Sequence, residues 1–239
     1  MKTLSITMYV VILATVLSRS TGFITPALMP RDMSLCSAVK ITGYDDAFQV
    51  IDDCAVRGTP SEKLYDAIRF IDKNALKIYP DESHKQALWD EAHGSWKLQL
   101  ATGGGKYTSF KKVPIFAFAV IDEQNFGNGV GWNQDSIILS LLGPHVFNTQ
   151  RRQMVITIDD MYLWGYNVTK FVPGFMKKAL GLGKRPEDFE KPQRPPAFTM
   201  IGASKHALIA RGGSGGIAIW TRLTNDIRPT AYGDNHRNG

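Results

Sequence analysis

The chain has 239 residues, of which 44% are hydrophobic, and a formal net charge of +6 at pH 7. This length and composition suit one globular core with at most a small appendage. Only two cysteines occur, Cys36 and Cys54, which excludes a disulfide framework.

The amino-terminal segment is typical of a targeting sequence. Lys2 is followed by an uncharged, largely apolar run as far as Ser18, and small residues at Ser20 and Gly22 predict a signal peptide over residues 1–22. Residues 23–43 are rich in hydroxyl groups and contain one acid, as in a transit peptide. A signal peptide joined to a transit peptide at Phe23 resembles the two-part presequence of algae whose plastids have extra membranes. We therefore expect a plastid protein, with plain secretion as the alternative.

The charge is weak once these segments are set aside. Residues 44–239 hold 24 bases against 21 acids. The acids gather in residues 44–93, which hold eleven acids and six bases, whereas residues 94–239 hold eighteen bases and ten acids. Because the bases are scattered and no nucleic-acid-binding module is present, we expect no nucleic-acid partner.

The next segment, residues 44–93, is predicted to be helical. A helix begins near Tyr44, a second follows Thr59-Pro60, and a third short helix lies around residues 81–91 and ends at Gly94. The apolar stripe of the second helix predicts an amphipathic helical hairpin that packs on the rest of the protein.

From Gly94 the hydrophobic period changes to two, which indicates strands. Eight or more short strands with Gly, Asn or Asp between them favour an antiparallel barrel or sandwich over βαβ units. We expect this β-domain to span residues 94–223, followed by a disordered tail over residues 224–239. Within it, Asp159-Asp160 is expected to form a hairpin turn, and His145 to lie in a turn.

A glycine-rich stretch, Ala210-Arg-Gly-Gly-Ser-Gly-Gly-Ile-Ala-Ile-Trp220, fits the permissive form of the dinucleotide-binding fingerprint. That fingerprint requires a helix after the glycines, but Ile217–Leu223 alternates like a strand, and Lys205–Ala210 before it does too. The glycines therefore predict the turn of a β-hairpin.

Two of these features resemble a known family. Gly94-Ser-Trp96 is similar to the Gly-x-Trp opening of the first strand in lipocalin-like proteins, and residues 208–219 look like the closing hairpin of the plastid lipid-associated proteins, or fibrillins. The resemblance spans roughly residues 60–223. It implies a mainly β fold, a lipocalin-like antiparallel β-barrel preceded by a short helical hairpin, that binds lipophilic molecules at plastid membranes or lipid droplets.

No catalytic or metal-binding pattern stands out. None of the five histidines has the spacing of a zinc site, and the Gly-x-Ser-x-Gly elbow of hydrolases is absent from the sequence. We expect no enzyme activity, catalytic residue, metal or cofactor. An isomerase or cyclase acting on a lipophilic substrate remains an alternative, with Tyr162, Tyr166, Asp159 or His206 as acid–base groups.

Two sets of residues are predicted to contact partners. Alternation along the strands nominates nine side chains as the inward, ligand-binding set: Trp96, Leu98, Leu100, Phe116, Phe118, Val120, Leu139, Ile156 and Ile219. A short basic amphipathic segment between two strands is predicted to be both a lid and a membrane contact, through Lys170, Phe171, Phe175, Lys177, Lys178, Lys184 and Arg185.

These sets lead to one expected function. We expect a barrel that carries or shelters a hydrophobic small molecule, such as a lipid, carotenoid or quinone, at a membrane or lipid droplet. A coat protein of lipid bodies without a ligand cavity is the further alternative.

Overall fold

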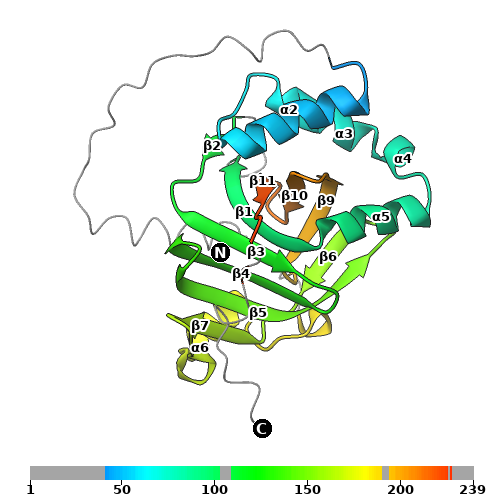
Figure 1. Cartoon of the computed structure of the whole chain (residues 1–239). Coiled ribbons are helices and arrows are strands. Elements are labelled where there is room, and N and C mark those ends of the chain that lie inside the picture. Colours follow the sequence, from blue (N-terminus) through cyan, green and yellow to red (C-terminus); the bar gives the residue numbers. More distant parts are fainter. Residues whose placement is uncertain (1–40, 103–108, 190–193, 226, 228–239) are drawn as a thin grey trace, which may run out of the picture.

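The computed structural model describes residues 41–102, 109–189, 194–225 and 227 (Figure 1). The predicted signal peptide, nearly all of the transit-like segment and most of the predicted tail lie outside the described residues.

Four helices precede the sheet within the described residues 41–102: α2 (Tyr44–Arg57), α3 (Leu64–Lys73), α4 (Ala75–Ile78) and α5 (Glu82–Ala92). The sequence predicts a helical segment with three helices, and the short α4 is the additional one. The end of α2 is set by Gly58, whose φ of 63° lets its amide donate to the carbonyl of Cys54. The start of α5 is set by Asp81, whose side chain accepts a hydrogen bond from the amide of His84 at 3.0 Å. Among the described residues, no helix has both the length and the apolar character that crossing a bilayer requires.

The strands form one sheet in which every pairing between strands is antiparallel. Their bounds are β1 (Gly94–Ala101), β2 (Lys111–Lys112), β3 (Phe116–Ile121), β4 (Asn125–Asn133), β5 (Ser136–Asn148), β6 (Gln153–Ile156), β7 (Asp160–Leu163), β8 (Tyr166–Asn167), β9 (Ala197–Ala203), β10 (Ala207–Gly212) and β11 (Ile217–Arg222). Eight of them close a ring in the order β4-β3-β1-β11-β10-β9-β6-β5, because β5 pairs again with β4 (Figure 1). This ring confirms the predicted fold class.

The glycine-rich stretch joins β10 to β11, as predicted. The two strands pair from Ala207 with Thr221 to Arg211 with Ile217, and the amide of Gly212 donates to the carbonyl of Gly216. The element after the glycines is therefore a strand, and the stretch does not have the strand-to-helix geometry that cradles a phosphate.

The expected hairpin turn at Asp159-Asp160 is wrong. Both β6 and β7 pair antiparallel with the single long strand β5, so the chain continues in one direction through a bend between them. At this bend the amide of Thr157 donates to Pro144 and the amide of Asp159 donates to Leu142, each at 2.9 Å. His145 also lies within β5 rather than in a turn, where it pairs with Ile156.

The ring has an apolar interior and two apolar patches on its outside. The interior cluster receives side chains from all eight strands of the ring. The first outer patch lies on β1, β9, β10 and β11 and is covered by α2 and α3, whose buried residues include Leu64, Ile68 and Ile71. The second outer patch lies on β3 and β5 around Phe118 and Ile227.

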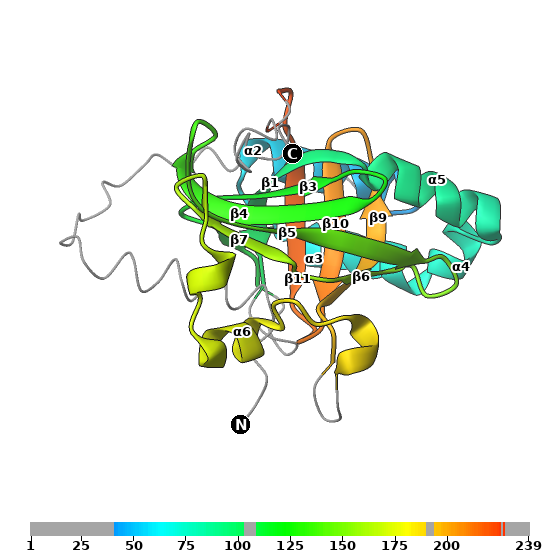
Figure 2. The same cartoon turned by 90° about the horizontal axis from the view of Figure 1, so that it is seen from below.

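The two ends of the ring are covered differently (Figure 2). At one end, Leu88 and Trp89 of α5 join the interior cluster. Towards the other end lie η1 (Thr169–Phe171) and α6 (Gly174–Leu180), and the cluster there includes Val172 and Leu182. The last 3₁₀ helix, η2 (Pro186–Asp188), follows before the chain returns to β9.

Candidate ligand-binding interior and its surroundings

Four of the nine residues nominated as inward lie in the interior cluster: Trp96, Leu98, Leu139 and Ile156. The nomination of Leu100 and Ile219 as inward is wrong, because both are part of the outer patch beneath α2 and α3. For Leu100 the cause is a β-bulge in β1 between Leu98 and Leu100. One extra residue at a bulge reverses the face on which the following side chains lie. Ile219 pairs with Leu100 and lies on the same outer face, whereas its neighbours Ala218 and Trp220 lie inside.

The nomination of Phe116, Phe118 and Val120 is also wrong. These side chains belong to the second outer patch, while Ala117, Ala119 and Ile121 of the same strand lie in the interior. Alternation separated the side chains of β3 into the correct two faces. The face with the larger side chains was nominated as inward, but the face with the smaller side chains lies inside. The larger side chains lie outside because Phe118 is opposite Gly129, where no side chain competes for the space.

Several interior residues escaped the sequence prediction. Some of them are large, such as Phe126, Phe198 and Trp220, and others are small or flexible apolar side chains: Ala117, Ala119, Met154, Met200, Ala210 and Ala218. Ala210 and Ala218 lie directly opposite each other on β10 and β11, so two adjacent strands present only methyl groups to the interior there. The two methionines, which are almost fully buried, have adaptable side chains that can fit irregular apolar shapes.

The α5 end of the interior is built around Trp89. Its ring stacks on Phe147 with centroids 4.4 Å apart, and meets His93 and His145 edge-on at 4.8 and 5.0 Å. His145 Nε2 donates to the carbonyl of Asp122 at 2.8 Å. Burial lowers the pKa of His93, and the neighbouring His145 lowers it further against the opposing effect of nearby carboxylates, chiefly Asp90. This end is therefore aromatic and, at neutral pH, holds His93 in its uncharged form.

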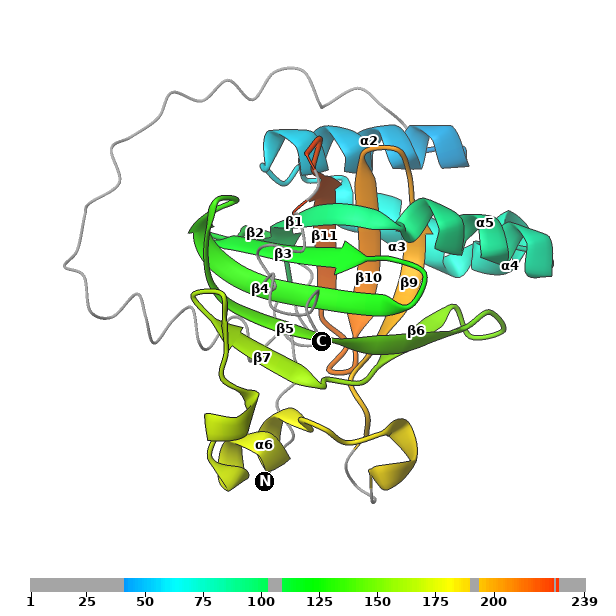
Figure 3. The same ribbon diagram turned by 60° about the horizontal axis from the view of Figure 1, so that its bottom comes forward.

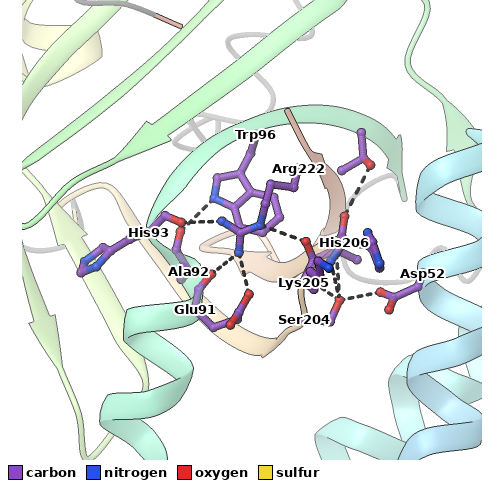
Figure 4. Close-up of polar contacts among 11 residues, drawn as sticks. Asp52, Glu91, Ala92, His93, Trp96, Ser204, Lys205, His206 and Arg222 are labelled. Carbon is purple, nitrogen blue, oxygen red and sulfur yellow. Dashed lines mark hydrogen bonds and ion pairs between the residues drawn. The ribbon is translucent and has the colours of Figure 1, made fainter. Parts of the chain in front are cut away.

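The Gly-x-Trp sequence has a structural purpose at the start of β1 (Figure 4). The guanidinium of Arg222 lies over the ring of Trp96 at 4.1 Å, and Trp96 Nε1 donates to the carbonyl of Ala92 at 2.8 Å. Gly94 has a φ of 125°, and a Cβ there would lie 2.8 Å from Arg222 Nη1. Glycine therefore makes room for the guanidinium on which the tryptophan stacks.

Arg222 also ties three chain segments together (Figure 4). It donates to the carbonyl groups of Glu91, His93 and Lys205 at 2.7, 2.8 and 3.0 Å, and it forms an ion pair with the Glu91 carboxylate at 2.7 Å. The end of α5, the start of β1 and the β9–β10 turn are thus fixed to the last strand by one side chain.

The four groups considered for acid–base catalysis are placed as follows. His206 lies in the β9–β10 turn, where Ser204 Oγ donates to Asp52 at 2.6 Å and accepts the amides of His206 and Ala207, fixing the turn to α2 (Figure 4). Asp159 forms an ion pair with Arg185 at 3.3 Å. Tyr162 is buried on β7, where burial and the Asp160 carboxylate raise its pKa, whereas Tyr166 is exposed on β8.

The basic segment has an inner and an outer side. Met176 and Leu180 pack against the interior cluster, whereas Phe171 and Phe175 are 83% and 75% exposed. The basic residues nominated as membrane contacts are not equivalent. Lys170 and Lys178 are exposed, and Lys177 is half-buried. Lys184 lies over the ring of Phe189 at 5.4 Å, and Arg185 is paired with Asp159.

Within the part of the chain that the structure describes, no three His, Cys, Asp or Glu side chains gather as metal ligands.

No protein-family model and no curated protein matches the chain. Among solved structures it is similar to a lipocalin-like protein from Bacteroides uniformis, with 13% identity, a TM-score of 0.36, and coverage of 56% of this chain and 99% of that one. It is also similar to an uncharacterized protein from Bacteroides eggerthii, with 13% identity, a TM-score of 0.35, and coverage of 55% and 98%.

Proposed function

We propose that the protein binds a hydrophobic small molecule inside the ring and acts as a carrier rather than a catalyst. The observation that supports this proposal is the closed eight-stranded ring with an apolar interior. Eight strands enclose a space that side chains can fill or that can hold one small ligand. The facing alanines at positions 210 and 218 favour the second case, because they leave the wall of β10 and β11 thin.

The apolar lining favours a lipid, carotenoid or quinone as the ligand. Such molecules are recognised by apolar shape with few polar contacts, and the interior cluster is made of aliphatic, aromatic and methionine side chains. The stacked and edge-on rings around Trp89 would suit a flat or conjugated group at that end.

Enlarging Ala210 should weaken this binding. We expect Ala210→Leu to weaken the binding of a fluorescent fatty acid by roughly tenfold or more, because the added methylene groups occupy the space that the ligand would fill. The measurement is a fluorescence titration, with the melting temperature recorded for each variant. Ala210→Val is the milder substitution if leucine prevents folding.

Ala87→Leu is the matched control, since Ala87 is exposed on α5. Equal loss of binding in the Ala87 and Ala210 variants, or full binding by a folded Ala210→Leu variant, would show that the probe does not bind inside the ring.

We also propose that the carrier meets a membrane surface through the basic segment. Its exposed Phe171 and Phe175 supply apolar contact, and Lys170, Lys177 and Lys178 supply positive charge. The inner side of the same segment contacts the interior cluster through Met176 and Leu180. A segment with these two sides would connect membrane contact with access to the ring.

Reversing two of these charges should weaken binding to anionic membranes. A lysine near such a surface contributes about 1 kcal/mol, so the Lys177→Glu, Lys178→Glu double variant should lose about tenfold or more in sedimentation with phosphatidylglycerol vesicles. The control with the same change in net charge is Lys73→Glu, Lys77→Glu, on exposed positions of α3 and α4. If both double variants bind like the wild type, the basic segment has no membrane role.

A further inference from the structure

The exposed aromatic side chains are concentrated in three neighbouring segments. Eight large hydrophobic side chains are exposed among the described residues, and five of them are aromatic. We call these five the aromatic rim: Trp132 (71% exposed), Trp164 (65%), Tyr166 (74%), Phe171 (83%) and Phe175 (75%). They lie near the β4–β5 turn, on the β7–β8 hairpin, and on η1 and α6. A soluble surface has no packing reason to gather them there.

The three segments follow one another along the same side of the molecule (Figures 2 and 3). Asn133 pairs with Ser136, which closes the β4–β5 hairpin, and the amide of Trp164 donates to Ile138 at 2.8 Å. The two hairpin turns are therefore adjacent. The amide of Val168 donates to Met161 at 2.8 Å, which folds the chain back along β7 and leads into η1.

Trp164 has a backbone conformation that is unusual for its residue type. Leu163 pairs with Tyr166, so Trp164 and Gly165 are the two central residues of a hairpin turn, with φ values of 47° and 79°. Positive φ at both positions defines a type I′ turn, for which Asn-Gly is the favoured sequence. A largely exposed tryptophan is thus held in a left-handed conformation, and such outliers are found mainly where a residue has a function.

Positive charge predominates around the rim, although Asp135 is exposed in the β4–β5 turn. From Trp164 to Leu180 the chain contains three lysines and no acidic residue. Lys111 and Lys112, which form the exposed strand β2, pair with the end of β1 at the same end of the ring. Tryptophan and tyrosine next to lysine is the combination that favours the headgroup region of a bilayer, since the rings enter the apolar boundary and the amines remain in water.

We propose that the aromatic rim docks on an anionic lipid bilayer, with Trp132 and Trp164 entering the headgroup region, so that the α6 end of the ring faces the membrane. This inference rests on the proposed membrane contact and extends it from one segment to two hairpin turns. A second copy of the chain is a poorer fit, because protein interfaces are depleted of lysine at their centres, whereas lysines are interspersed through this surface.

The test uses substitutions at the turns that should not harm the fold. Trp164→Asn places the residue that this turn favours, so its melting temperature should equal or exceed that of the wild type. Binding to vesicles of phosphatidylcholine mixed with phosphatidylglycerol should nevertheless fall by about tenfold, since a large aromatic contact is lost. Trp132→Thr should weaken binding similarly, and the double variant more than either. Leu76→Gln, at an exposed apolar position on α4, is the matched control and should bind like the wild type.

Intrinsic fluorescence gives a second readout. The chain has five tryptophans, and Trp89, Trp96 and Trp220 are buried in the interior cluster. Lipids brominated near the headgroup should therefore quench the wild type through Trp132 and Trp164, and should quench the double variant much less.

Each outcome is distinguishable. The Lys177→Glu, Lys178→Glu variant could lose vesicle binding while the folded tryptophan variants bind fully. That result would contradict docking by the aromatic rim and would still support membrane contact by the basic segment. If the wild type binds no vesicle, both membrane proposals are wrong. The proposal that the ring carries a ligand is then still tested separately by the fatty-acid titration. Concentration-dependent dimers that Trp164→Asn dissociates, without vesicle binding, would identify a second copy as the partner instead.

Discussion

Alanine at position 143 is expected to destabilise the fold by about 3 kcal/mol or more. Gly143 lies in β5 at the point where the bend between β6 and β7 crosses it, and an added Cβ would fall on the carbonyl oxygen of Thr157 and lie 2.9 Å from the amide of Asp159. Both obstacles are backbone atoms of residues whose amides donate to β5, Thr157 to Pro144 and Asp159 to Leu142, so neither residue can move without breaking the pairing. Urea unfolding of Gly143→Ala beside the wild type measures this loss.

Gly213→Ala is the appropriate comparison, because no atom lies within 4 Å of the position where its Cβ would be. Its free energy of unfolding should change by no more than about 0.5 kcal/mol. A Gly143→Ala protein as stable as Gly213→Ala would mean that the bend does not lie against β5 as described.

The second large effect is expected at Arg222. Arg222→Ala removes hydrogen bonds to three carbonyl groups, an ion pair and the contact with Trp96. Its side chain is 29% exposed and that of Glu91 is 44% exposed, so solvent screening limits the ion pair to a small part of the effect. The loss of charged hydrogen bonds to three carbonyl groups, of which the one to His93 is part-buried, should cost about 3 kcal/mol.

Arg222→Lys separates charge from geometry. Lysine retains the positive charge but has a single donor group in place of the planar fork, so it should recover less than half of the loss. Arg57→Ala removes an exposed ion pair with Asp53 within α2 and should cost less than about 1 kcal/mol. Thermal and urea unfolding of the three variants check this order, which would be contradicted if the Arg222 and Arg57 variants were equally stable.

The sequence predicted the fold class because local signals agreed with each other. Hydrophobic period two from Gly94 onwards, turn residues between the runs and the glycine-rich hairpin each indicated an antiparallel sheet, and the sheet closes into a ring. The two faces of each strand were less predictable. The inner face of a strand and an outer face that another element covers look alike in sequence when both are apolar. Here α2 and α3 cover an apolar outer face. The bulge at Gln99 left no signal in the alternation at all.

The candidate interior was predictable only on strands without such complications. Trp96 and Leu98 precede the bulge, Leu139 is followed by the polar Ser140, and Ile156 lies between the partly exposed Val155 and the polar Thr157. The rim residues Trp132 and Trp164 were not predicted, because hydrophobic alternation indicates strands but does not indicate which aromatic side chains at their ends are exposed. The signal that could have found one of them was Trp164-Gly165 between two strand-like runs, which marks a two-residue turn with an aromatic side chain at its tip.

The position of β11 governs the order in which this protein can fold. The last strand of the ring inserts between the first, β1, and the strand before it, β10, so that Trp96 pairs with Arg222. Until the ribosome has released residue 222, both neighbours have open edges that can pair with other chains. Closure of the ring therefore depends on contacts distant in sequence, which slows folding and leaves two strand edges open to other chains in the meantime.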